Sequence, residues 1–238
     1  MSIDPSEYRR VVVLTGAGIS VASGLRPYRG PGGIWTEGGD VSLSTAEGFA
    51  KDPAGSWALF GAMRNAAKNA EPNPAHFSLA QFETACPGEV LVVTQNVDGL
   101  HQRAGSSNVV EVHGSIFRSR PVGDACDCAP FPDDRYEEGV PRCGTCNVML
   151  RPDVVFFGEA IPVDAEWTIK KALREVDLFI AVGTSGTVSP ASNYVRSAAY
   201  SGARTVYVNL EPMEPANPYF QETYLGPAEE VLPRLLSS

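Results

Sequence analysis

The chain has no long apolar stretch, and its longest uncharged apolar runs, VVVL and LFIAV, are only long enough for core strands. A helix that spans a bilayer needs about 20 mostly apolar residues. The opening stretch MSIDPSEYRR also lacks the apolar region of a secretory signal peptide. We therefore expect a cytoplasmic protein with no membrane partner.

Positive charge is also scarce. Lysine and arginine together number 19 against 28 aspartates and glutamates, so the formal net charge is -9. Proteins that bind a phosphate backbone carry clustered lysine and arginine. Nucleic acid is therefore not an expected partner, whereas an acidic protein does not repel a lysine-rich polypeptide.

The chain contains neither an internal repeat nor a low-complexity tract. Its 238 residues are 43% hydrophobic and 20% charged, as in ordinary globular proteins. A chain of this length can bury one large core, alone or with a smaller inserted domain. The sequence does not fix the oligomeric state, and a monomer is the default expectation.

Cysteine is scarce and unevenly placed. Four of the five cysteines fall within 21 residues: Cys126, Cys128, Cys143 and Cys146. The spacing in CGTC lets two thiolates hold one tetrahedral zinc ion, and the closer-spaced CDC is the weaker half of the set. The cluster predicts a structural Zn2+ site; reduced thiols in a loop without metal are the alternative. The isolated Cys86 is expected to be a partly buried apolar residue.

Apolar, β-branched segments that end in small or polar residues alternate with helical stretches. The predicted strands lie in residues 9–20, 89–96, 108–115, 177–185 and 203–211, and the predicted helices in 74–85, 163–176, 189–202 and 228–238. This alternation predicts a doubly wound α/β fold with a mostly parallel, Rossmann-like sheet. In such folds the ligand binds at the carboxyl ends of the strands.

Two stretches break the alternation and predict insertions. Residues 31–75 hold a glycine-rich loop and a helical module, and residues 118–150 hold the clustered cysteines among prolines and aspartates. The expected division therefore assigns 1–30, 76–117 and 151–238 to the Rossmann-like domain. The cysteine-bearing segment has almost no apolar periodicity, so bound zinc would have to supply its folding energy.

The turn GAGIS indicates the ligand of the large domain. Gly16, Ala17 and Gly18 lie where backbone can approach a phosphate at the start of a helix, followed by Ser20. The next glycine is Gly24, so the spacing departs from the dinucleotide fingerprint, and a plain tight turn explains it equally well.

Two further strand ends favour a dinucleotide. GTSGTVSP supplies a loop suited to phosphate or ribose, and NLE supplies a carboxylate of the kind that binds ribose hydroxyls. The candidate cofactor-binding residues at these ends are Gly183, Thr184, Ser185, Asn209 and Glu211.

Several motifs together resemble one family. GAGISVASGLRPYRG, TQNVDGLHQRAG, EVHGS, CGTC, RPDVVFFGE, GTSGTVSPAS and NLEP occur in the order and approximate spacing of the sirtuins, from Val11 to about Leu236. Sirtuins are NAD-dependent protein lysine deacylases. The resemblance implies NAD and Zn2+ as cofactors, acylated-lysine proteins as substrates, and lysine, nicotinamide and O-acyl-ADP-ribose as products.

The resemblance also implies roles for polar residues at two strand ends. His113 matches the general base, and a near-neutral pKa suits that work. Gln95, Asn96 and Asp98 match the lining of the nicotinamide and ribose pocket, with Asn96 among the catalytic residues. The alternative for His113 is a structural histidine, and the alternative for Gln95, Asn96 and Asp98 is a hydrogen-bonded turn. For His101 we expect a structural role.

The cofactor loop carries two more matches and one departure. Arg29 matches the family arginine near the phosphates, and Tyr28 the aromatic residue that covers the nicotinamide side. Pro27 replaces the aspartate or threonine of other members, and its side chain cannot form hydrogen bonds.

Two segments are expected to contact the protein substrate. Val155, Phe156, Phe157 and Gly158 match the segment that pairs with substrate backbone, although apolar residues there, Phe156 especially, could equally be core. Phe60 and Met63 occupy the positions of the Tyr-x-x-Arg pair that binds acidic acyl groups in some sirtuins, and Arg64, one position on, is expected to point elsewhere. These residues predict a preference for neutral acyl groups.

The zinc module departs from the family pattern. Pro121 lies near the place where a first cysteine is expected, so either Cys126 and Cys128 both bind zinc or one of them acts with Asp124 or Asp127. The alternatives for function are mono-ADP-ribosyl transfer or NAD hydrolysis at the same site, and a non-enzymatic NAD-sensing module.

Overall fold

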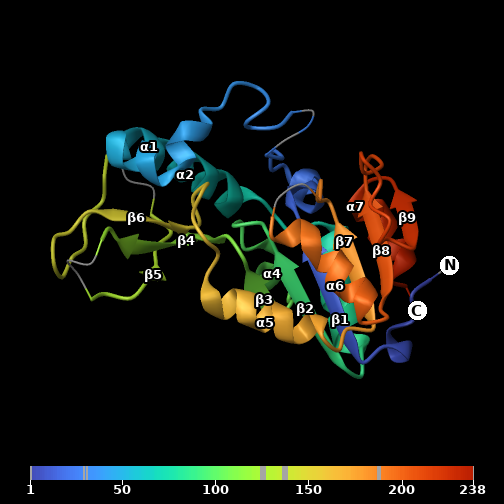
Figure 1. Cartoon of the computed structure of the whole chain (residues 1–238). Helices are drawn as coiled ribbons and strands as arrows, with labels where there is room; N and C mark the ends of the chain where they lie inside the picture. The colour runs from blue at the N-terminus through green and yellow to red at the C-terminus, as the bar shows by residue number, and fades with distance from the viewer. Residues whose placement is uncertain are drawn as a thin grey trace.

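The computed structural model describes residues 2–28, 30, 32–123, 127–135, 139–186 and 189–237. Its larger sheet has six strands in the order β3-β2-β1-β7-β8-β9, and all neighbours run parallel (Figure 1). The strands are β1 (Arg10–Thr15), β2 (Glu89–Thr94), β3 (Val109–Glu111), β7 (Leu178–Val182), β8 (Arg204–Asn209) and β9 (Glu222–Leu225). The predicted doubly wound, mostly parallel sheet is confirmed.

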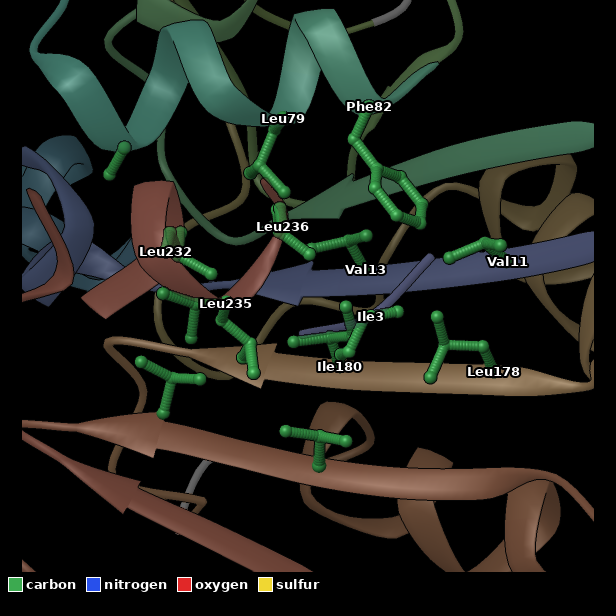
Figure 2. Close-up of a cluster of buried hydrophobic side chains, with 14 of the residues drawn as sticks. Ile3, Val11, Val13, Leu79, Phe82, Leu178, Ile180, Leu232, Leu235 and Leu236 are labelled. Carbon is green, nitrogen blue, oxygen red and sulfur yellow. The ribbon is translucent and has the colours of Figure 1, made fainter. Parts of the chain in front are cut away.

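The central strands are buried on both faces because each contains a continuous apolar run. In β1, Val11 and Val13 face a core formed with α3 (Pro74–Ala85) and α7 (Ala228–Leu235) (Figure 2). Val12 and Leu14 face the opposite core, formed with α5 (Val163–Leu173) and α6 (Tyr194–Tyr200). The two-residue alternation of a strand thus divides one apolar run between two helical layers.

A second, smaller sheet is antiparallel, with the strand order β5-β4-β6. It consists of β4 (Gly114–Pro121), β5 (Phe131–Pro132) and β6 (Leu150–Val154). The 3-10 helix η3 (Val41–Ser44) and the helices α1 (Ala46–Lys51) and α2 (Pro53–Asn69) lie at the same end of the molecule (Figure 1). Trp57 and Phe60 of α2 share one core with Ile116 and Leu150 of the small sheet.

The two inserted stretches therefore pack into one smaller domain rather than standing apart. Trp57 of α2 donates its indole N–H to the Leu150 carbonyl across 2.9 Å, which fixes the helical module to β6. The predicted domain limits after residue 117 and before residue 151 remain predictions. Strand β4 crosses the first limit, and β6 begins one residue before the second.

The remaining elements are short. They are the 3-10 helices η1 (Pro5–Glu7), η2 (Ala17–Ser23) and η4 (Ala191–Asn193), and the helix α4 (Leu100–Arg103). Within the described ranges, none of the helices combines the length and the apolar character that crossing a membrane requires.

Candidate active site

A cavity of about 860 Å³ opens at the carboxyl ends of the parallel strands, between the large sheet and the small domain. The turns after β1, β2, β7 and β8 form one side, and α2 and the segment after β6 form the other. The predicted site residues that line it are Gly16, Ala17, Gly18, Tyr28, Phe60, Met63, Gln95, Asn96, His113, Val155, Phe156, Phe157, Gly158, Gly183, Thr184, Ser185, Asn209 and Glu211. Arg29 lies outside the described residues.

Glycine in the first turn permits a close backbone approach. A Cβ atom at Gly16 would lie 2.7 Å from the Gly183 carbonyl oxygen, and one at Gly18 would lie 2.7 Å from the Gly183 Cα atom. The amide of Gly18 donates to the Gly183 carbonyl across 2.9 Å. The turns after β1 and β7 thus pack backbone against backbone and present a cradle without side chains to the cavity.

The helix expected after this turn is the 3-10 helix η2, which spans seven residues and is capped by Gly24 with φ 86°. Glycine and serine are poor α-helix formers, which favours this short, tight element over a regular helix. The structure therefore supports the glycine cradle more directly than a helix-dipole site for phosphate.

Within the described part of the chain, the Asn96 side-chain amide forms hydrogen bonds through its nitrogen but not through its oxygen. Its Nδ2 donates to the Gly16 carbonyl and to Ser20 Oγ, each across 3.2 Å. Its buried Oδ1 has no hydrogen-bond partner among the described residues. Because Asn96 lines the cavity, this oxygen is available to a bound ligand. Beside it, Gln95 is held by Thr184 Oγ1 at 3.0 Å.

Ser20 and Asp98 are predicted site residues outside the cavity lining. Ser20 Oγ donates to Asp98 Oδ2 across 2.8 Å and accepts from Asn96. Asp98 also accepts from the Leu100 amide at the start of α4, and burial raises the pKa of Asp98. In this structure both residues orient the Asn96 amide, and their contact with a cofactor stays a prediction.

His113 follows β3 and faces the cavity. Its Nδ1 lies 2.9 Å from the Gln95 carbonyl oxygen, which can only accept, so Nδ1 carries the proton. The lone pair is therefore on Nε2. Burial lowers the pKa of His113, partly offset by the Gln95 hydrogen bond, so the imidazole is neutral near pH 7.

His101 lies behind the site rather than in its wall. The residue is 1% exposed, its Nε2 is 2.9 Å from Thr15 Oγ1, and its ring packs on His76 with centroids 5.0 Å apart. Burial, with His76 nearby, lowers the pKa of His101 to about 3, and burial lowers that of His76 to about 4. This placement agrees with the structural role expected for His101.

The acyl side of the cavity is apolar. Phe60 stacks on Phe156 with ring centroids 5.5 Å apart, and Met63 lies one helical turn further along α2. Arg64 points to the other side of the helix, where it donates to the Ile116 carbonyl across 2.6 Å and lies 3.7 Å from Asp133. The expectation that Arg64 points elsewhere is confirmed. Of the described residues that line the cavity, none is lysine or arginine.

The segment after β6 lines the cavity and turns at Gly158, whose φ is 88°. Val155 donates its amide to the His113 carbonyl across 2.9 Å, and Phe157 donates to the Ser44 carbonyl across 2.8 Å. Phe156 is 2% exposed and belongs to the core of the small domain, whereas Phe157 is 42% exposed. Pairing of this segment with a substrate peptide stays a prediction.

Three of the four clustered cysteines meet. The Sγ atoms of Cys128, Cys143 and Cys146 all lie within 4.8 Å of one another. Backbone hydrogen bonds in the CGTC turn lower the pKa of Cys143 to about 6, which favours the thiolate that binds metal. Three thiol ligands fit a tetrahedral zinc ion. Cys126 and Asp124 lie outside the described residues, so the fourth ligand remains a prediction, and Asp127 is not part of this group.

Sequence reasoning missed Trp35 and Ser44, which also line the cavity. Trp35 stacks on Tyr28 with centroids 6.1 Å apart and meets Phe157 edge to face at the same distance. An aromatic residue in the glycine-rich PGGIW loop was a usable signal for Trp35. Nothing in the local sequence singles out Ser44.

Comparison with known proteins identifies the family. The Sir2 family model matches residues 16–190. A protein of Pyrobaculum aerophilum named NAD-dependent protein deacylase 2 is 46% identical over 230 residues, which cover 96% of this chain and 90% of that protein.

Two solved structures share the fold. A crystal structure of a Sir2 homologue–NAD complex superposes with a TM-score of 0.87 and 33% identity over 97% of this chain and 89% of that one. A complex of Sir2 with a p53 peptide and NAD+ gives a TM-score of 0.79 and 32% identity, with 96% and 92% of the two chains covered. The chain belongs to the Sir2 family.

Proposed function

We propose that the chain is an NAD-dependent protein lysine deacylase that releases lysine, nicotinamide and O-acyl-ADP-ribose. One observation carries the proposal: a single cavity brings Asn96 and His113 together with the segment after β6. Membership of the Sir2 family and the relative named a deacylase support the same activity.

The residues present fit NAD. The cavity volume of about 860 Å³ lies within the range of about 300–1,000 Å³ that small-molecule sites occupy. The Gly16–Gly183 cradle allows backbone to approach a pyrophosphate, and the unpaired Asn96 Oδ1 can accept from a ribose hydroxyl or an ordered water. When bound, NAD supplies an electrophilic ribose carbon and nicotinamide as the leaving group.

His113 acts as the general base. It takes a proton at Nε2 from a ribose hydroxyl, while Nδ1–H remains on the Gln95 carbonyl. That hydrogen bond fixes the tautomer before the reaction and stabilises the imidazolium formed during it. Asn96, held by Gly16 and Ser20, orients the ribose.

The remaining predicted contacts divide between NAD and the protein substrate. Glu211 follows the last residue of β8 by two positions, where a carboxylate can bind ribose hydroxyls. Val155 to Gly158 bind substrate backbone next to His113, so the acyl-lysine enters beside the base. Acylated-lysine proteins are the partners.

The acyl preference is for neutral groups. Phe60 and Met63 offer no charge to a carboxylate, and an unpaired buried carboxylate costs several kcal/mol. Turnover of acetyl-, butyryl- and succinyl-lysine peptides of one sequence tests this preference. We expect the acetyl and butyryl peptides to react fastest, and a dominant succinyl rate would contradict the proposal.

A further inference from the structure

A second cavity, of about 720 Å³, adjoins the active-site cavity. The two cavities share the residues Val154, Val155, Glu159 and Ala160, so one stretch of chain forms a wall of both. Charged side chains from three strands also line the second cavity: Glu111 of β3, Arg118 and Arg120 of β4, and Asp153 of β6.

Arg118 forms ion pairs with two strands at once. Its Nε donates to Asp153 Oδ2 across 2.9 Å, and its Nη1 donates to Glu111 Oε2 across 3.1 Å. Glu111 is the last residue of β3, two positions before His113, and Asp153 lies two positions before Val155. The guanidinium group therefore joins the strand that leads to the general base to the strand that leads to the substrate segment.

This side-chain bridge lies where the backbone ladder is interrupted. Ser115 of β4 pairs with Asp153 of β6, and the register shifts before the next pair, Ser119 with Pro152. Proline has no amide hydrogen to donate to a ladder. Irregularities of this kind occur next to active sites, where they re-aim side chains. Arg118 lies inside the interruption, so its side chain connects the strands where their backbones do not.

The contact that the bridge supports is the one between the base and the substrate segment. The Val155 amide donates to the His113 carbonyl across 2.9 Å. A shift of β6 at Asp153 would move Val155 relative to His113. A misplacement of about 1 Å caused by a change far from the chemistry can lower a rate by about a hundredfold.

We propose that Arg118 is a positioning residue of the active site, an inference that rests on the proposed deacylase function. It acts through His113 and Val155, because it holds the two strands that lead to them at a fixed spacing. Arg118 itself is not among the residues that line the active-site cavity.

Arg120 provides a matched comparison. It lies two positions further along β4 and lines the same second cavity, and its side chain is 39% exposed, as is that of Arg118. Its Nε lies 3.6 Å from Asp153 Oδ1, and within the described ranges it forms no ion pair with Glu111. Loss of Arg120 therefore removes the same charge from the same cavity but leaves the bridge to β3 in place.

The test compares the steady-state kinetics of Arg118→Met, Arg120→Met and the wild type with NAD and an acetyl-lysine peptide. We expect Arg118→Met to lower kcat/KM for the peptide by about tenfold or more, because it loses two charged hydrogen bonds. The KM for NAD should keep its wild-type value, because the turns after β1, β7 and β8 lie outside the bridge. Arg120→Met should keep the wild-type value of both constants.

Two further variants separate the bridge from the charge and from folding. Arg118→Lys keeps the charge but lacks the planar fork that reaches two carboxylates, so kcat/KM should stay low. Glu111→Ala removes the bridge from the β3 side, and it decides the matter where Arg118→Met fails to fold. It should lower kcat/KM to the same extent as Arg118→Met, and the double variant should lose no more.

The outcomes separate the role of Arg118 from the deacylase function. Normal turnover by the wild type, with equal kcat/KM for Arg118→Met and Arg120→Met, would overturn only the role of Arg118. Wild-type kcat/KM in Arg118→Lys would also overturn it, because charge alone would then suffice. So would losses of activity that follow the loss of thermal stability in every variant. No turnover of the peptide by the wild type would overturn both proposals.

Discussion

His113 shows how one backbone contact sets the chemistry of a side chain. The Gln95 carbonyl holds the proton on Nδ1, and burial lowers the pKa of His113, so Nε2 is a free base at neutral pH. The base is lost only when the pH falls below this lowered pKa. The rate should therefore be flat near pH 7 and fall at a pH below 6.5, the ordinary value for histidine.

The measurement is the pH profile of kcat/KM for an acetyl-lysine peptide. Enzyme held at each pH and returned to pH 7.5 before assay serves as the control for irreversible unfolding. Loss of activity that already begins above pH 7 would mean that the pKa of the base is raised, contrary to this account.

The polar cluster after β2 separates into residues with different roles. Asn96→Ala removes the buried, unpaired oxygen of a residue that lines the cavity, and we expect a fall in turnover of at least about a hundredfold with little loss of stability. His101→Ala leaves a buried cavity beside Thr15 and should lower stability by about 2–4 kcal/mol with a smaller effect on turnover. Activity assays and urea unfolding of both variants test the division. Equal loss of activity in two well-folded variants would refute it.

Sequence reasoning predicted the residues whose position follows from a strand end. Asn96 and His113 both come directly after apolar strands of a parallel sheet, so their convergence could be anticipated. Trp35 and Ser44 could not be, because their importance arises from contact with Phe157, more than a hundred residues away in sequence. The position of Asp98 behind Asn96 likewise depends on tertiary hydrogen bonds.

At the scale of elements, the five strands of the large sheet other than β9 were predictable because each contains β-branched or apolar residues in a row and ends in polar ones. The edge strand β9, of sequence ETYL, has no such run, and only half of its positions are even partly buried. The small sheet was also missed: β6 reads LRPDV, and proline and aspartate disfavour strands. Pro152 is tolerated next to a register shift between β4 and β6, which sequence alone does not reveal.

The cysteine cluster is tied to β6 by backbone hydrogen bonds. Cys143 donates to the Val148 carbonyl across 2.8 Å, and Leu150 donates to the Pro141 carbonyl across 2.9 Å. A metal ion bound by the three described thiols would therefore brace the small sheet and, through Trp57, the helix α2.

We expect purified protein to contain about one zinc per chain, and chelation to lower the thermal stability of the small domain. Cys143→Ser should lose the metal, whereas Cys86→Ser, which changes a buried cysteine outside the cluster, should retain it. Metal analysis and thermal unfolding provide the measurement. Less than about half an equivalent of zinc after purification without chelators would contradict a four-ligand site.

At the scale of the whole molecule, two buried histidines link folding to pH. His76 and His101 have pKa values lowered to about 4 and about 3, whereas in the unfolded chain they titrate near 6.5. The unfolded state therefore binds more protons between these values. Stability is complete above pH 6.5 and falls as the pH decreases towards 4, by up to about 1.4 kcal/mol per pH unit for each histidine.

The pKa of buried Asp98 is raised, so Asp98 makes the protein more stable, not less, as the pH falls. A variant of one histidine is therefore needed to isolate the histidine contribution to stability. In His101→Gln, an amide can still donate to Thr15 but does not titrate. Urea unfolding between pH 7 and 4.5 should show a shallower slope for this variant than for the wild type. Identical slopes would show that His101 is not neutral in the folded state.

The most direct test of the central claim is the identity of the product formed from NAD and an acetyl-lysine peptide. Mass spectrometry should find free lysine peptide, nicotinamide and O-acetyl-ADP-ribose in equal amounts, with the last nearly absent for His113→Ala. Release of nicotinamide without O-acetyl-ADP-ribose would indicate hydrolysis or ADP-ribosyl transfer, and no consumption of NAD would indicate a binding module. Either result would contradict a deacylase.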